Sequence, residues 1–170
     1  MSRIKTVLGA LAFWLTGAMP LASAQLEVNI STGVFEPTPI AIPDFEAKGV
    51  DPEIASQISE IVRSDLESTG LFVLTPPSAF IQTDVNIEVA PRFADWKIIK
   101  SDALVIGSVE SVLRDGTELL RGSLRMWDVY GEELMRFEDE SGALVSGRRF
   151  LTKPEDLRRI AHKISDAIYS

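Results

Sequence analysis

The side chains that could do acid–base chemistry in this chain are a single histidine and two groups of adjacent carboxylates. The one histidine, His162, stands four residues after Arg158 and four before Asp166, so on a helix it would neighbour both. A general base needs a nucleophile and an orienting group within hydrogen-bond reach, and the sequence implies neither for His162. A histidine on the surface, or half buried, is therefore the favoured interpretation.

The adjacent carboxylates are Glu132-Glu133 and Glu138-Asp139-Glu140. Glycoside hydrolysis needs two carboxyl groups that face each other across a cleft. Acids that follow one another in a run of strands and turns point to opposite faces or into loops, so we expect solvated turns here. A periplasmic hydrolase that combines Glu133 or Glu138 with His162 is the enzymatic alternative.

Metal and cofactor sites are not indicated by any motif. The sequence contains no cysteine, which excludes thiolate nucleophiles and thiolate metal ligands. The acidic run is too short for a calcium loop, which alternates oxygen ligands around a glycine bend, and no glycine-rich phosphate loop occurs. We expect no catalytic residue, no metal and no cofactor.

The charge of the chain restricts its partners. A formal net charge of −8 and a pI near 4.7 argue against a nucleic acid or an anionic membrane surface as partner. Two basic pairs, Arg148-Arg149 and Arg158-Arg159, flank the start of the last predicted helix. They could bind an anionic partner, although such pairs are more often solvated.

The first 24 residues have the layout of a secretory signal peptide. Positive charges at the start precede an apolar run, Val7 to Leu15, and small residues end it at Ala22-Ser23-Ala24. The run is shorter than the ~20 residues that span a bilayer, so we expect no membrane insertion after cleavage. We predict a cut between Ala24 and Gln25. Export without cysteines fits a Gram-negative periplasm.

The segment after the predicted cut reads as a strand. Leu26, Val28 and Ile30 alternate with polar residues, which predicts one apolar face. Pro37 and Pro39 lack a backbone donor and predict an extended connector. We expect residues 25–38 to form this strand and its connector, and residues 39–170 to form the folded domain.

Two long amphipathic helices are predicted in that domain. The first helix begins at Pro52, with Asp51 as its N-cap, and its apolar stripe predicts that it extends to Thr69. The second runs from Lys153 to Tyr169 behind a capping box, Thr152 to Glu155. Neither a glycine nor a basic last turn closes it, so we expect the natural polypeptide to continue.

The remaining elements are mostly strands. Buried strands are expected at Pro39 to Phe45 and Leu71 to Leu74, and a short helix at Phe93 to Lys100 with Trp96 on its inner side. The dipeptide Asp115-Gly116 predicts a type I′ hairpin within an antiparallel meander from Ala103 to Leu134, and a third strand from Leu134 to Phe137. The expected fold class is α/β, a mixed β-sheet with two long amphipathic helices packed on it, plus an extended N-terminal strand segment.

Several fragments together resemble the N-terminal domain of the TolB family, periplasmic proteins of the Tol-Pal envelope system. They are "PIAIPDF" with the helix "EIASQISEIVRSDLESTGLF", "SDALVIGSV" with its Asp-Gly hairpin, "LRMWDV", and the terminal "RRIAHKISDAIY". The resemblance covers residues 25–170. It departs from the family at Ser101, where a glycine is usual.

The resemblance implies a partner and a binding segment. In similar proteins the segment just after the signal cut docks on the C-terminal domain of the inner-membrane protein TolA. A strand at a free terminus can pair with another sheet's edge without obstruction, so strand addition is the implied mode. The implied binding residues are Gln25, Leu26, Glu27, Val28, Asn29, Ile30, Ser31, Thr32, Gly33, Val34, Phe35 and Glu36.

The function implied by the resemblance is that of a periplasmic interaction module. It would link TolA to the outer-membrane and peptidoglycan side and support outer-membrane integrity and envelope invagination at cell division. Family members bind Pal through a six-bladed β-propeller that is not present in this sequence, so Pal binding is not carried over. The non-enzymatic alternative is a periplasmic regulator or scaffold of peptidoglycan machinery.

Overall fold

The computed structural model describes residues 36–169 of the chain. The predicted signal peptide, the cut between Ala24 and Gln25 and the strand predicted at Leu26 to Ile30 lie outside the described residues.

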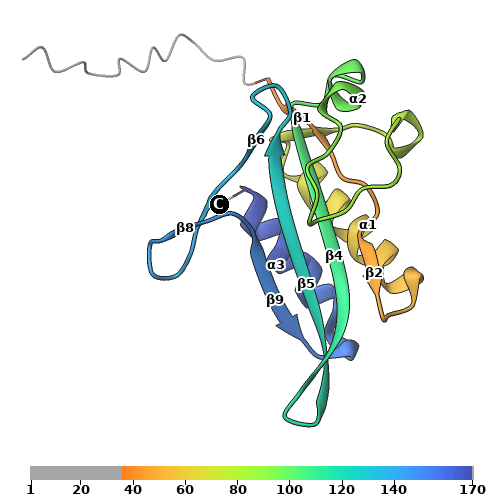
Figure 1. Cartoon of the computed structure of the whole chain (residues 1–170), viewed down its shortest axis with the longest axis vertical. Helices are drawn as coiled ribbons and strands as arrows, with labels where there is room; N and C mark the ends of the chain where they lie inside the picture. The colour runs from red at the N-terminus through yellow and green to blue at the C-terminus, as the bar shows by residue number, and fades with distance from the viewer. Residues whose placement is uncertain (1–35, 170) are drawn as a thin grey trace, which may run out of the picture. The chain divides into compact units, whose positions relative to one another are not determined.

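The described residues form a mixed β-sheet with helices packed on it, as the sequence predicts (Figure 1). The strands of the main sheet are β1 (Thr38–Ala41), β2 (Glu46–Lys48), β3 (Phe72–Leu74), β4 (Ala103–Arg114), β5 (Thr117–Asp128), β6 (Glu133–Leu134) and β9 (Arg148–Thr152). β1 lies between β3 and β4 and runs parallel to both. β2 is also parallel to β4, whereas β4, β5 and β6 form the predicted antiparallel meander.

The remaining elements are helices, short turns and one separate hairpin. The helices are α1 (Pro52–Ser68), α2 (Phe93–Ile98) and α3 (Leu157–Tyr169), with 3₁₀ turns η1 (Pro77–Ala79) and η2 (Pro154–Asp156). The strands β7 (Phe137–Glu138) and β8 (Leu144–Val145) pair only with each other among the described residues. This hairpin projects from the body of the sheet (Figure 1).

The local signals read from the sequence explain α1 and the central hairpin. The carboxylate of Asp51 accepts the N–H of Glu53 at 3.0 Å, and the helix stops before Gly70, which has a φ of 69°. Asp115 and Gly116 have φ values of 50° and 75°, the positive pair that a type I′ turn requires. Both predictions are confirmed.

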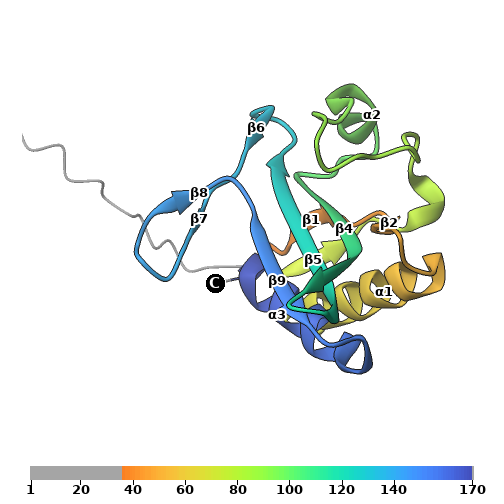
Figure 2. The same ribbon diagram turned by 60° about the horizontal axis from the view of Figure 1, so that its bottom comes forward.

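The larger part of the core lies between the sheet and the two long helices. Figure 2 shows α1 and α3 side by side on the same face of the sheet. Their buried side chains include Ile58, Val62, Leu66, Ile160 and Ile164, which pack against Val105, Val109, Leu120 and Leu124 of the sheet. A second, smaller cluster lies on the opposite face, where Trp96 of α2 is fully buried with Leu104 and Ile106.

The sequence predicts Pro39 both in the extended connector and at the start of a buried strand from Pro39 to Phe45; the structure shows it in the strand, which ends at Ala41. Pro39 lies inside β1, a central strand. Its ladder with β4 begins one residue later, where Ile40 pairs with Ala103. The missing donor therefore falls before the ladder starts, while the Pro39 carbonyl still accepts the N–H of Asp102 at 2.9 Å.

Three further expectations about the C-terminal part are wrong. The strand expected from Leu134 to Phe137 is divided between β6 and β7, because the chain leaves β5 after the Met135 N–H donates to the Met126 carbonyl. Arg148-Arg149 do not flank the last helix but begin β9. Thr152 ends β9 opposite Leu120, so it does not cap a helix, and the last helix starts through η2 without a side-chain cap.

Candidate partner-binding site

Of the predicted partner-binding residues, Gln25 to Glu36, the structure describes only Glu36. Its side chain is exposed, and it stands two residues before β1. Gln25 to Phe35 lie outside the described residues, so their role stays a prediction.

The sheet holds β1 firmly from its first residue. The N–H of Thr38 donates to the Leu71 carbonyl at 2.9 Å, and β3 and β4 occupy the two edges of β1. The ladder around β1 therefore needs no additional strand. Residues that precede Thr38 are not required to complete it.

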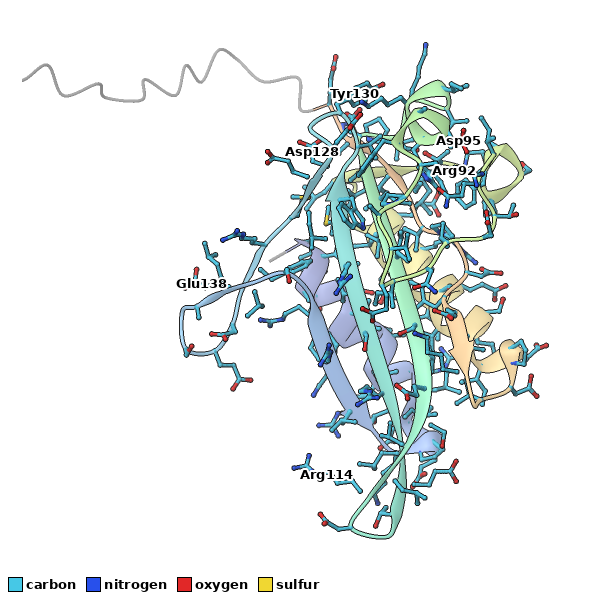
Figure 3. All side chains as sticks on the ribbon, in the orientation of Figure 1. Arg92, Asp95, Arg114, Asp128, Tyr130 and Glu138 are labelled. Atoms are coloured by element: carbon cyan, nitrogen blue, oxygen red, sulfur yellow. The ribbon has the colours of Figure 1, made fainter. Side chains whose placement is uncertain are left out.

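Two large apolar side chains, Tyr130 and Ile98, are exposed at the end of the sheet near α2. The carboxylate of Asp128 accepts the N–H of Tyr130 at 3.0 Å and shapes a turn after β5 in which Tyr130 is 54% exposed (Figure 3). Lys97 of α2 joins this turn through an ion pair with Glu132 at 2.6 Å. The next residue of α2, Ile98, is 69% exposed. This surface was not predicted, because only the tertiary fold places α2 beside the turn.

His162 belongs to a polar contact between α1 and α3. Its Nδ1 lies 2.7 Å from Oδ2 of Asp65, and the hydroxyl of Ser165 donates to the same oxygen at 2.8 Å. Sequence reasoning missed Asp65, which is 97 residues away from His162. Its place beside Leu66, at the margin of the α1 apolar stripe, is the signal that could have indicated a helix–helix contact.

This contact is not arranged as a nucleophile with its base. A catalytic serine donates to the histidine, which the carboxylate then orients. Here Ser165 donates to Asp65 and also to the Ala161 carbonyl, and it is only 1% exposed. The carboxylate therefore joins two side chains of α3 to α1.

The carboxylates considered for hydrolysis lie on other elements. Glu133 is in β6 and Glu138 in β7. Glu138 lines a hollow beside Met135 and Arg136, whereas the hollow beside His162 is lined by residues of α1, α3 and the segment after α1. Among the described residues, no hollow is lined by His162 together with Glu133 or Glu138, the combination of the enzymatic alternative.

Asp139 is instead a structural carboxylate of the β7–β8 hairpin. A hydrogen bond from the Ser141 hydroxyl, followed by those from the backbone N–H groups of Ala143 and Ser141, holds the pKa of Asp139 below its ordinary value. Arg148 adds a smaller electrostatic contribution in the same direction. The carboxylate thus closes the turn of the hairpin, because each donor stabilises its charged form.

Within residues 36–169, no group of three or more histidine or acidic side chains is placed to hold a metal ion. The same residues include no helix that is both long enough and apolar enough to cross a membrane.

Two comparisons with known proteins, with a family model and with a curated relative, agree on one family. A family model described as the TolB amino-terminal domain matches residues 26–135. The Tol-Pal system protein TolB of Paramagnetospirillum magneticum is 40% identical over 172 residues, which cover 99% of this chain and 36% of that protein. The chain thus spans about a third of the length of this relative.

A solved structure shows the same fold. The crystal structure of TolB from Acinetobacter baumannii superposes with a TM-score of 0.58 over 79% of this chain and 28% of that one. The sequences are 18% identical there, so this similarity concerns the fold alone.

Proposed function

Because this chain belongs to the TolB amino-terminal domain family, we propose that it is the partner-binding module of a Tol-Pal system protein. It is exported to the Gram-negative periplasm by cleavage between Ala24 and Gln25. It then binds the C-terminal domain of TolA through residues Gln25 to Glu36. In this role it links TolA to the outer-membrane and peptidoglycan side and supports envelope integrity and invagination at cell division.

The observation that carries this proposal is where the family match begins. It starts at Leu26, the second residue after the expected cut, so the alternating segment belongs to the part of the chain that the family shares. Support also comes from β1, which already has a neighbour on each edge. The alternating segment is therefore not required to complete β1, which supports its addition to the edge of a partner's sheet. The alternative is that Leu26, Val28 and Ile30 add to this domain's own sheet, and loss of folding after their removal would favour it.

The proposed role is binding and not catalysis. The single histidine is engaged with Asp65 at the contact of α1 and α3. A reaction centre needs polar groups that converge where a substrate can reach them. The hydroxyl that shares the Asp65 carboxylate, that of Ser165, is buried in the same contact.

Calorimetry with the TolA C-terminal domain tests the proposal. Ile30→Pro should abolish binding, because it removes a ladder donor and an apolar contact together. Asn29→Ser, on the polar side of the predicted strand, is the matched control and should bind as the parent does. Removal of residues 25–36 should leave the circular dichroism spectrum near native and eliminate binding. Full-strength binding after this removal would refute the proposal.

A further inference from the structure

β9 forms an edge of the sheet that has no strand on its outer side among residues 36–169. It pairs only with β5, from Arg148 opposite Leu124 to Thr152 opposite Leu120. Figure 1 shows β9 as the outermost strand of the sheet below the β7–β8 hairpin. An uncovered edge strand is a template for pairing with another chain.

The register identifies which backbone groups of β9 point outward. Arg114 and Thr117 flank the two-residue turn of the central hairpin and so form a hydrogen-bonded pair. Backbone N–H and C=O groups of successive residues point to opposite sides of a strand, so those of the even-numbered residues of β5 point away from β4, towards β9 and β6. The bond from Met135 N–H to the Met126 carbonyl agrees with this. The residues of β9 that lie opposite them, Arg148, Phe150 and Thr152, therefore direct their backbone groups towards β5. Arg149 and Leu151 therefore present their N–H and C=O groups outward.

There is room beside this edge for another strand. A hollow of about 550 Å³ lies between Arg149, Leu151, Lys163 of α3 and the β7–β8 hairpin. A second, of about 260 Å³, continues it towards the end of β9 and shares Leu151 and Lys163. Together the two hollows follow β9 along its length.

Positive side chains surround the same groove. Arg149, Arg159 and Lys163 are exposed and make no ion pair within residues 36–169. The nearby carboxylate of Asp139 is occupied by the N–H and hydroxyl groups of its own turn. The lining of the two hollows also includes Arg148 and Lys153 on the basic side and Glu140 and Asp156 on the acidic side. Five basic side chains thus stand against three acidic ones, and a groove of net positive charge in a chain of net charge −8 is complementary to an acidic partner.

We propose that the outer edge of β9 binds an extended acidic segment of a protein partner by strand addition. The outward groups of Arg149 and Leu151 supply the backbone hydrogen bonds. Acidic side chains of the added strand lie in the row of Arg149. Arg149 lies opposite Ser123 and so faces away from α3. The apolar side chains of the added strand lie in the alternate row, on the α3 side, beside the half-buried Phe150 and the aliphatic stems of Arg159 and Lys163.

A second copy of this chain is a poor occupant of the edge. Two β9 strands paired through their outer edges would bring both sets of Arg149, Arg159 and Lys163 together. Like charges placed opposite each other oppose such pairing. The charge of the groove therefore selects an acidic strand over another β9.

A short synthetic peptide of alternating glutamate and valine is the probe, added to the full chain and observed through backbone amide NMR shifts and calorimetry. We expect saturable binding, with the shifts concentrated in β9. Arg149→Glu should weaken binding about tenfold or more, because it reverses a charge beside the bound strand. Arg114→Glu is the matched control and should have little effect. Figure 3 places Arg114 at the tip of the β4–β5 hairpin, beyond the end of β9, and Arg114 lines neither hollow.

Two variants at one position test the backbone contribution. Leu151→Pro removes an outward N–H, which an edge strand tolerates, and should abolish peptide binding while the inward bonds to β5 persist. Leu151→Ala keeps the N–H and should still bind.

The proposal is independent of the TolA segment, so removal of residues 25–36 should leave peptide binding unchanged. Binding that requires this removal would overturn the proposal, since the chain's own segment would then be the occupant. Equal binding of a lysine–valine peptide, a dimer with β9 at its interface, or no binding at millimolar peptide would also overturn it.

Discussion

Alternate residues of β5 face opposite sides of the sheet, and the two sides surround them differently. Leu120 and Leu124 face α1 and α3 and are 2% and 1% exposed. Arg121, Ser123 and Arg125 face the other way and are only half buried. One side of β5 thus contributes to the apolar core, and the other side forms part of a polar surface.

The polar side is itself divided along its length. Near α2, Trp96 donates to the Gln82 side chain at 3.1 Å and closes a small apolar cluster over Leu104 and Ile106. Farther along β5, Glu110 and Arg121 form an ion pair in a shallow hollow. The helix-covered face therefore supplies most of the stability, whereas the far end of the other face is available for contacts.

The largest effect that tests this comparison is expected in the helix-covered core. Ile164→Ala should lower the free energy of unfolding by about 2–5 kcal/mol, because it leaves a cavity between α3 and the sheet. Ser123→Ala, on the opposite face, should change it by less than about 0.5 kcal/mol. Urea denaturation followed by circular dichroism measures both. Equal losses of unfolding free energy for the two variants would contradict the claim that the helix-covered face supplies most of the stability.

An intermediate effect is expected where polar groups join the two helices. Asp65→Ala removes the common acceptor of His162 and Ser165 and leaves the buried Ser165 hydroxyl with the Ala161 carbonyl alone. We expect a loss of about 1–3 kcal/mol of unfolding free energy. Asp166→Ala, an exposed residue of α3, is the matched control in the same denaturation assay. A cost for Asp65→Ala no larger than the control would show that the contact contributes nothing.

A smaller effect is expected for the ion pair on the polar face. Glu110 and Arg121 are 35% and 38% exposed at their side chains, so solvent screens their attraction. Glu110→Gln should cost at most about 1 kcal/mol of unfolding free energy. The cost should shrink at high salt, which denaturation at two ionic strengths would show. A cost that salt does not change would indicate a different origin.

The smallest effect is local and depends on pH. The pKa of Asp139 lies below its ordinary value of 3.8 in the folded chain. Its carboxylate therefore stabilises the hairpin above the pKa of the unfolded chain, and this contribution is lost as pH falls through the lower folded pKa. The amide NMR signals of Ser141 and Ala143 should titrate with a midpoint below 3.8. Asp139→Asn should remove this transition, and a midpoint at or above 3.8 would contradict the prediction.

The elements that could be predicted from sequence are those whose cause is local. The cap at Asp51, the apolar stripe of α1 and the positive φ angles of Asp115 and Gly116 each act within a few residues. Neighbours along the chain decide such features before any tertiary contact forms. These local features, together with the resemblance to the TolB family, were sufficient to predict the α/β fold class.

The misplaced elements are those that depend on distant partners. β9 is a strand because Gly122 and its neighbours in β5 offer an uncovered ladder, and no periodicity in "RRFLT" indicates it. Pro39 is tolerated in a central strand because the register with β4 starts one residue later. The candidate binding residues, Gln25 to Glu36, come from the family resemblance and stay a prediction.

The sequence by itself determined where the helices and the hairpin form, since capping, periodicity and turn geometry act over a few residues. Only the tertiary structure decided that Asp65 meets His162 and Ser165, and that Arg149 lies beside Lys163 on a sheet edge that no strand of residues 36–169 covers. These contacts join residues far apart in the chain. Their positions follow from how two helices and a sheet exclude water from a common core.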